Sequence, residues 1–151
     1  LALAVLGMAE ISILGDVNVS RFGSRLPGAG GFINISQSAQ KVIFCGTFTA
    51  GGLRTSIEDG SLVILEEGSS TKFIKAVQQV TFSGKRAVSQ GTPILYVTER
   101  CVFELRPKGL ALTEIAPGVD LEKDILRQMD FTPIIGDIRQ MDQRIFKPEL
   151  M

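Results

Sequence analysis

A glycine-rich stretch is the part of this sequence whose residue types and spacing favour chemistry. It runs Gly28-Ala29-Gly30-Gly31-Phe32, so three glycines fall within four positions. Without a Cβ atom the backbone approaches a ligand closely, and successive N–H groups can form a concave anion site. The loop therefore suits a phosphate group or the oxyanion of an acyl-transfer reaction. A tight turn without a ligand is the structural alternative for the same glycines.

Other phosphate, nucleophile and metal motifs do not match. No Gly-Lys-Ser or Gly-Lys-Thr follows the loop, as a Walker A motif requires, and the spacing after Gly28 does not give the GxGxxG of a dinucleotide fold. The chain has no histidine. This excludes a Ser-His-Asp or Cys-His device and a His-ligated metal site within these residues. We expect neither a metal nor a permanently bound cofactor.

The two cysteines point to a compartment rather than to a reaction. Cys45 and Cys101 lie far apart inside apolar runs and form no CxxC pair. We interpret both as buried free thiols, which is typical of a protein in the reducing cytoplasm.

The elements that must position the loop follow from the hydrophobic pattern. Residues 1–14 predict one or two buried strands broken near Gly7, and residues 17–20 predict a short strand before the loop. Residues 36–40 predict a helical turn. Residues 41–46 are almost continuously apolar, which predicts a strand covered on both faces.

The second half of the chain predicts mainly strands. Asp59-Gly60 is a strong hairpin signal because both turn positions favour positive φ. The strands of that hairpin are predicted at 53–57 and 62–65, and a strand is predicted at 72–82, for which a helix is the alternative. A polar loop at 83–91 separates it from three meander strands at 94–98, 101–105 and 110–115. Two helices are predicted at the end of the chain: one is capped by Asp120 and carries Leu121, Ile125 and Met129, and a shorter one is capped by Asp137 and carries Ile138, Met141 and Ile145.

Length and charge limit the fold and the partners. The 151 residues suit one domain, and 16 basic residues balance 16 acidic ones. This balance gives no reason to expect nucleic acid or an anionic membrane as a partner. The apolar first residues are too few to span a bilayer and lack the basic flank of a signal peptide. We expect an α/β domain over residues 1–151, an open sheet with flanking helices and an added β meander.

The loop and its surroundings resemble the family I coenzyme A transferases. GAGGFINI at 28–35 resembles the GxGGF loop of that family. The other segments that resemble it are LGMAE (6–10), DVNVSRFG (16–23), FCGTFTAGG (44–52), VTERCVFEL (97–105) and LTEIAPGVD (112–120). The similarity is greatest to the single-chain acetate, propionate or acetoacetate CoA-transferases, of which this chain resembles the C-terminal, β-subunit-like part.

The resemblance implies transfer of CoA between a short-chain acyl-CoA and a carboxylic acid, in short-chain fatty acid or ketone body metabolism. In this family a glutamate carboxylate attacks the acyl-CoA, and a mixed anhydride and then a glutamyl-CoA thioester form. Gly28 corresponds to the main oxyanion donor, and Gly30, Gly31 and Phe32 to the substrate-binding loop. The implied partners are the CoA thioester substrate, the carboxylate, the N-terminal half of the transferase and further copies in a homo-oligomer.

The family's nucleophilic glutamate belongs to an upstream segment that these residues do not match. We therefore assign no catalytic role to the glutamates of this chain, which include Glu10, Glu58, Glu66, Glu67, Glu99 and Glu114. Glu99 beside Arg100 predicts a structural ion pair, and Glu66-Glu67 a solvated loop. We expect this chain alone to be inactive. A non-catalytic binding or assembly module is the alternative. A sugar-phosphate isomerase of related architecture would need an acid/base pair at the loop, and this sequence offers no candidate pair there.

Overall fold

A six-stranded mixed sheet organises the chain, of which the structure, a computed structural model, describes residues 1–19 and 31–148. The spatial order of its strands is β1 (Ala4–Gly7), β4 (Val42–Cys45), β10 (Ile94–Val97), β11 (Cys101–Arg106), β12 (Gly109–Ile115) and β13 (Ile134–Gln140). β4 pairs in parallel with both β1 and β10, while β11 is antiparallel to both of its neighbours. The predicted α/β fold class is confirmed, and the predicted meander is half of this sheet rather than an addition to it.

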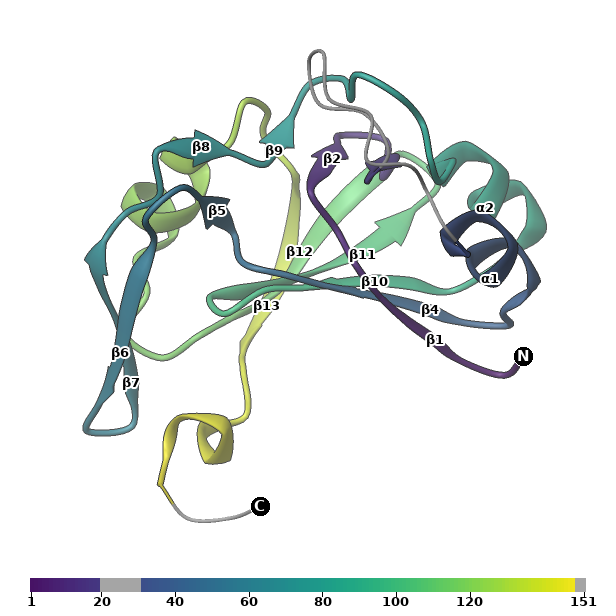
Figure 1. Cartoon of the computed structure of the whole chain (residues 1–151). Coiled ribbons are helices and arrows are strands. Elements are labelled where there is room, and N and C mark those ends of the chain that lie inside the picture. Colours follow the sequence, from purple (N-terminus) through teal and green to yellow (C-terminus); the bar gives the residue numbers. More distant parts are fainter. Residues whose placement is uncertain (20–30, 149–151) are drawn as a thin grey trace.

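Two short helices lie over the same face of the sheet (Figure 1). α1 (Phe32–Ser38) lies in the connection from β1 to β4, and α2 (Gly84–Gln90) in the connection from β4 to β10. Phe32 and Ala87 bury the inner sides of these helices in one common core. Parallel strands require crossover connections of this kind, so the helices follow from the strand order.

The prediction of a polar loop at 83–91 is wrong, because this segment forms α2. Ser83 caps its first turn by accepting a hydrogen bond from the Arg86 N–H at 3.2 Å. Gly91 ends the helix in the left-handed conformation with φ 69°. A serine before a helix and a glycine after it are standard termination signals. Only one side of this short helix faces the core, so most of its residues are polar, and this composition led to the prediction of a loop.

Smaller strands build out from the sheet. β2 (Glu10–Ser12), β3 (Val17–Asn18) and β9 (Phe73–Ile74) form a three-stranded sheet, and β5 (Thr49–Ala50) pairs with β8 (Ser70–Thr71). β6 (Arg54–Glu58) and β7 (Ser61–Glu66) form the predicted hairpin. Its turn residues Asp59 and Gly60 have φ of 52° and 76°, as the Asp-Gly signal requires.

Three predicted segments are corrected by the structure. The strand predicted at 72–82 is much shorter, because only β9 forms within it, together with an isolated bridge from Phe82 to Val17. Residues 134–140 form β13 and not a helix capped by Asp137; Asp142 instead caps the 3-10 helix η3 (Gln143–Phe146). Asp120 is a cap as predicted, but it begins a π-helix, η1 (Leu121–Ile125), followed by a 3-10 turn, η2 (Leu126–Gln128).

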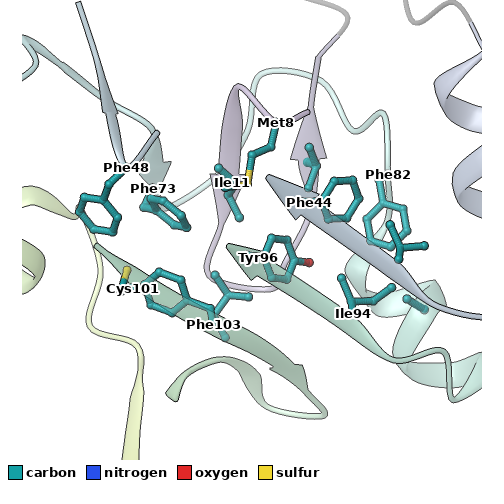
Figure 2. Packing of buried hydrophobic residues seen from close by; sticks show 14 of the residues in the cluster. Met8, Ile11, Phe44, Phe48, Phe73, Phe82, Ile94, Tyr96, Cys101 and Phe103 are labelled. Carbon is teal, nitrogen blue, oxygen red and sulfur yellow. The ribbon is translucent and has the colours of Figure 1, made fainter. Parts of the chain in front are cut away.

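Stacked aromatic rings fill the core between the sheet and the elements above it (Figure 2). Phe44 of β4 lies against Phe32 and Tyr96, at ring distances of 5.7 and 5.3 Å. A second group joins Phe73 to Phe48 and Phe103, at 4.8 and 5.0 Å. Such pairs add about 0.5–1.5 kcal/mol each beyond the burial of their area.

The two cysteines differ in exposure. Cys101 is fully buried in the aromatic core, where burial raises the pKa of its thiol and keeps it protonated. Cys45, at the end of β4, is exposed. The prediction of two buried thiols is therefore right for Cys101 and wrong for Cys45, whose strand is covered on one face only.

Candidate functional site

The glycine loop meets the described structure at Gly31 and Phe32. Gly28 and Gly30 lie outside the described residues. Gly31 precedes α1 with φ −81°, and an added Cβ would lie 3.4 Å from the Ile35 side chain, an ordinary contact. Phe32 is 8% exposed and stacks on Phe44. The loop is thus followed by a side chain anchored in the core, and a substrate contact by Phe32 stays a prediction.

Polar side chains hold the strand just before the loop. Asn18 of β3 is fully buried, and its Nδ2 donates to Glu10 Oε1 at 2.6 Å. Glu10 Oε1 also accepts from the Gln78 N–H at 3.3 Å. These bonds join β3, β2 and the segment after β9. Asn18 therefore stabilises local structure, while Asn34 lies exposed on α1.

A buried arginine follows β10, at the edge where parallel strands end. Arg100 is fully buried, and its guanidinium donates to Glu67 twice, with Nη1–Oε2 at 2.7 Å and Nη2–Oε1 at 3.0 Å. Nε donates to Glu99 Oε2 at 3.3 Å, and Nη1 also donates to the Asp124 carbonyl at 2.9 Å. The group lies 4.9 Å from the Phe48 ring centroid. Arg100 therefore connects segments that are remote in sequence.

The two glutamates that face Arg100 are also held by other groups. Glu99 Oε1 accepts from the Phe48 N–H at 2.7 Å, and Glu67 Oε1 from the Thr49 hydroxyl at 2.5 Å. Burial raises the pKa of Glu67, but hydrogen bonds from Arg100 and Thr49 outweigh it and leave that pKa below its ordinary value. The predicted structural ion pair of Glu99 is confirmed. The predicted solvated role of Glu67 is wrong.

Lys72 is a buried cation that the sequence did not indicate. It is 7% exposed, and its Nζ donates to the Thr47 carbonyl at 2.6 Å. Burial lowers the pKa of this ammonium group, and the nearby Glu99 carboxylate opposes that shift. Lys72 and Glu99 together fix residues 47 and 48, which follow β4. Ligands of open α/β sheets bind beyond the carboxyl ends of parallel strands, so these contacts order the edge where a substrate is expected.

The described residues hold no group of three or more histidine, cysteine or acidic side chains placed to ligate a metal ion. No helix among residues 1–19 and 31–148 is long and apolar enough to cross a bilayer.

Comparison with known proteins gives close relatives for nearly the whole chain. It is 52% identical over 142 residues to the acetate CoA-transferase YdiF of Escherichia coli, covering 93% of this chain and 27% of that protein. It is 54% identical over 149 residues to the caffeate CoA-transferase of Acetobacterium woodii, covering 95% of this chain and 28% of that protein. The chain thus spans little more than a quarter of these relatives. A scan against models of protein families finds no match.

Solved structures agree with these sequences. The acyl-CoA transferase YdiF of Escherichia coli O157:H7 superposes on this chain with a TM-score of 0.97 and 50% identity, over 99% of this chain and 29% of that one. The same relative has been solved as a thioester complex with CoA. The resemblance predicted from the sequence is therefore confirmed.

Proposed function

Because the chain is a segment of the coenzyme A transferase family, we propose that the complete protein moves CoA from a short-chain acyl-CoA to a carboxylic acid. The observation that carries this proposal is the identity of 52% to 54% along more than nine-tenths of the chain to two CoA-transferases. The CoA thioester complex of the Escherichia coli relative supports CoA as the substrate carrier. We do not expect a permanently bound cofactor.

The proposed chemistry uses a glutamate from a segment outside these residues. Its carboxylate attacks the thioester carbonyl carbon, a C–O bond forms, and the C–S bond breaks to release CoA thiolate. The thiolate then attacks the glutamyl carbonyl, which releases the first carboxylate and leaves a glutamyl-CoA thioester. An incoming carboxylate reverses both steps, so atoms and charge balance without a redox partner.

In this proposal the present chain supplies the oxyanion donors. Each tetrahedral intermediate places a negative charge on the former carbonyl oxygen, and backbone N–H groups fixed in advance stabilise that charge. The N–H of Gly28 has this role, and Gly30, Gly31 and Phe32 shape the loop against the substrate. The burial of Phe32 supports this assignment, since a loop whose end is anchored in the core keeps its backbone N–H donors in place. Glu67 and Glu99 are unsuited as nucleophiles because Arg100 holds both.

Trapping the covalent intermediate tests this function. The complete protein is incubated with acetyl-CoA without acceptor, digested, and mapped by mass spectrometry for a peptide that carries CoA through a thioester. We expect the adduct on a glutamate outside residues 1–151. An adduct on a glutamate within this chain, or rapid transfer with no adduct, would contradict the proposal. A complete protein that binds CoA without turnover would favour the binding or assembly module.

A further inference from the structure

The short strand β3, which leads towards the glycine loop, is held on both of its sides. On one side it pairs antiparallel with β2. On the other side Val17 forms an isolated antiparallel bridge with Phe82. In this bridge the Val17 N–H donates to the Phe82 carbonyl at 3.0 Å, and the Val17 carbonyl accepts from the Thr81 and Phe82 N–H groups at 2.9 and 3.0 Å. Thr81 and Phe82 therefore act as a second edge partner of β3.

The Thr81 side chain extends this hold beyond the end of the strand. The pairing of β3 with β2 ends at Asn18. At the next residue, the Val19 N–H donates to the Thr81 hydroxyl oxygen at 3.1 Å. Because Thr81 is only 6% exposed, this bond lies in a medium of low polarity, where hydrogen bonds are stronger than in water. Val19 is the last residue described before the loop, so Thr81 fixes the backbone where the chain enters it.

The neighbouring residue, Phe82, contacts the aromatic group on which the other end of the loop rests. Its ring lies edge-on to the Phe44 ring, with the centroids 4.9 Å apart (Figure 2). Phe32, the first residue of α1 after the loop, stacks on the same Phe44 ring at 5.7 Å. Rings that are close-packed in a core have little freedom to shift. Phe82 is therefore linked to the exit of the loop, as Thr81 is to its entry.

We propose that Thr81, together with the ring of Phe82, positions the glycine loop for CoA transfer. The two residues connect the entry of the loop, at Val19, to its exit, at Phe32. Backbone donors stabilise an oxyanion well only where they are fixed before the charge develops. Neither side chain has to touch the reacting atoms, because both act through the backbone of the loop. This inference rests on the proposed function, in which Gly28 supplies such a donor.

The hydroxyl group is the part of Thr81 that this role requires. Serine keeps the acceptor oxygen, whereas valine has nearly the shape of threonine and no acceptor. With valine at this position, the Val19 N–H loses its hydrogen bond to the residue 81 side chain, and the chain enters the loop with more freedom. A displacement of about 1 Å in the reacting geometry can cost about 10²-fold in rate, so a loosened loop slows the chemical step more than it weakens substrate binding.

Steady-state kinetics of the complete protein test the role of this hydroxyl. Acyl exchange between acetyl-CoA and a carboxylate acceptor is measured for the parent, Thr81→Val and Thr81→Ser. We expect Thr81→Val to lower kcat about tenfold, with the KM for acetyl-CoA within about twofold of the parent. Thr81→Ser should keep most of the parent kcat, because it retains the acceptor for the Val19 N–H.

Thr113→Val is the matched control for the loss of a buried hydroxyl. Thr113 of β12 is 9% exposed, and its hydroxyl donates to the Val102 carbonyl at 3.1 Å. In the sheet, β12 is separated from β4 by β10 and β11. We expect Thr113→Val to lower the melting temperature, as Thr81→Val does, and to leave kcat per folded molecule at the parent value. A similar loss of kcat in both valine variants, or in Thr81→Ser and Thr81→Val, would overturn the inference.

A double-mutant cycle with Gly28→Val shows whether Thr81 acts through the loop. In the Gly28→Val protein, Thr81→Val should lower kcat by less than about twofold more, because the donor that it positions is already lost. A further tenfold loss, or a parent kcat in Thr81→Val where Gly28→Val is slow, would overturn this inference and leave the proposed function standing. A parent kcat in Gly28→Val would remove the oxyanion role and this inference with it. If Thr81→Val does not fold, Phe82→Leu decides: a lowered kcat per folded molecule supports the inference, and a parent kcat overturns it.

Discussion

Arg100 and Glu67, which are 33 positions apart in sequence, form a two-point ion pair with Nη1–Oε2 at 2.7 Å and Nη2–Oε1 at 3.0 Å. The guanidinium is fully buried, whereas the Glu67 side chain is 26% exposed. The pair joins the β10–β11 turn to the segment after β7. Both segments lie beside the carboxyl ends of the parallel strands. The ion pair therefore fixes their positions at the edge where a substrate is expected to bind.

Removing the arginine should destabilise the fold strongly. Arg100→Met leaves Glu67 and Glu99 without their cation, and loss of one partner from a buried pair costs about 3–5 kcal/mol. We expect the lower end of this range, because both glutamates keep some contact with water. Urea unfolding measures it. Arg54→Met is the matched control, since the Arg54–Glu66 pair is exposed at 3.7 Å. Equal effects of the two changes would contradict the role of Arg100.

Stability should fall in acid through Glu67. The folded state lowers the pKa of Glu67 from 4.5, so the unfolded chain binds the proton first as the pH drops. The contribution of Glu67 is therefore complete above pH 4.5 and is lost as the pH falls through the folded pKa. Urea unfolding across this range should show a shallower pH slope for Glu67→Gln than for the parent, whereas Glu66→Gln should keep the parent slope. Parallel curves for all three proteins would exclude this linkage.

The isolated 151-residue chain should not transfer CoA. The proposed nucleophile belongs to another segment, and the described glutamates closest to the strand ends are held by Arg100. Mixing the purified chain with acetyl-CoA and a carboxylate acceptor should give no acyl exchange above the uncatalysed background, measured by chromatography of the CoA esters. Turnover that copurifies with the folded chain would place the nucleophile within these residues.

The sequence predicted the strands well because their apolar runs are long and their turns carry strong signals, such as Asp59-Gly60. It misplaced β13 because Ile138, Met141 and Ile145 fall at helical spacing, and only the pairing with β12 makes residues 134–140 a strand. The Arg100–Glu67 pair could not be predicted, because nothing local links two residues so distant in sequence. The glycine spacing indicated the loop, and the resemblance to a family then singled out Gly28 as the oxyanion donor.

Two glycines, Gly118 and Gly136, should differ in their tolerance of a side chain. Gly118 lies in the turn after β12, where its φ is 87° and an added Cβ would lie 2.8 Å from the Leu62 carbonyl oxygen. Gly118→Ala should therefore lower the melting temperature. Gly136 of β13 has no atom within 4 Å of an added Cβ and no positive φ, so Gly136→Ala should leave it unchanged. Similar melting curves for the two variants would contradict this reading of the turn.

The turnover of Gly28→Val in the complete protein tests the central claim most directly, with Gly136→Ala as the matched control. If the Gly28 N–H stabilises the oxyanion, a side chain there obstructs the acyl oxygen, and loss of one such donor costs about 10²–10³ in rate. We predict that kcat falls by about this factor for Gly28→Val, with CoA affinity and melting temperature close to the parent, and stays at the parent value for Gly136→Ala. A lowered melting temperature with normal kcat per folded molecule would show that Gly28 serves the turn alone, and would remove the oxyanion assignment.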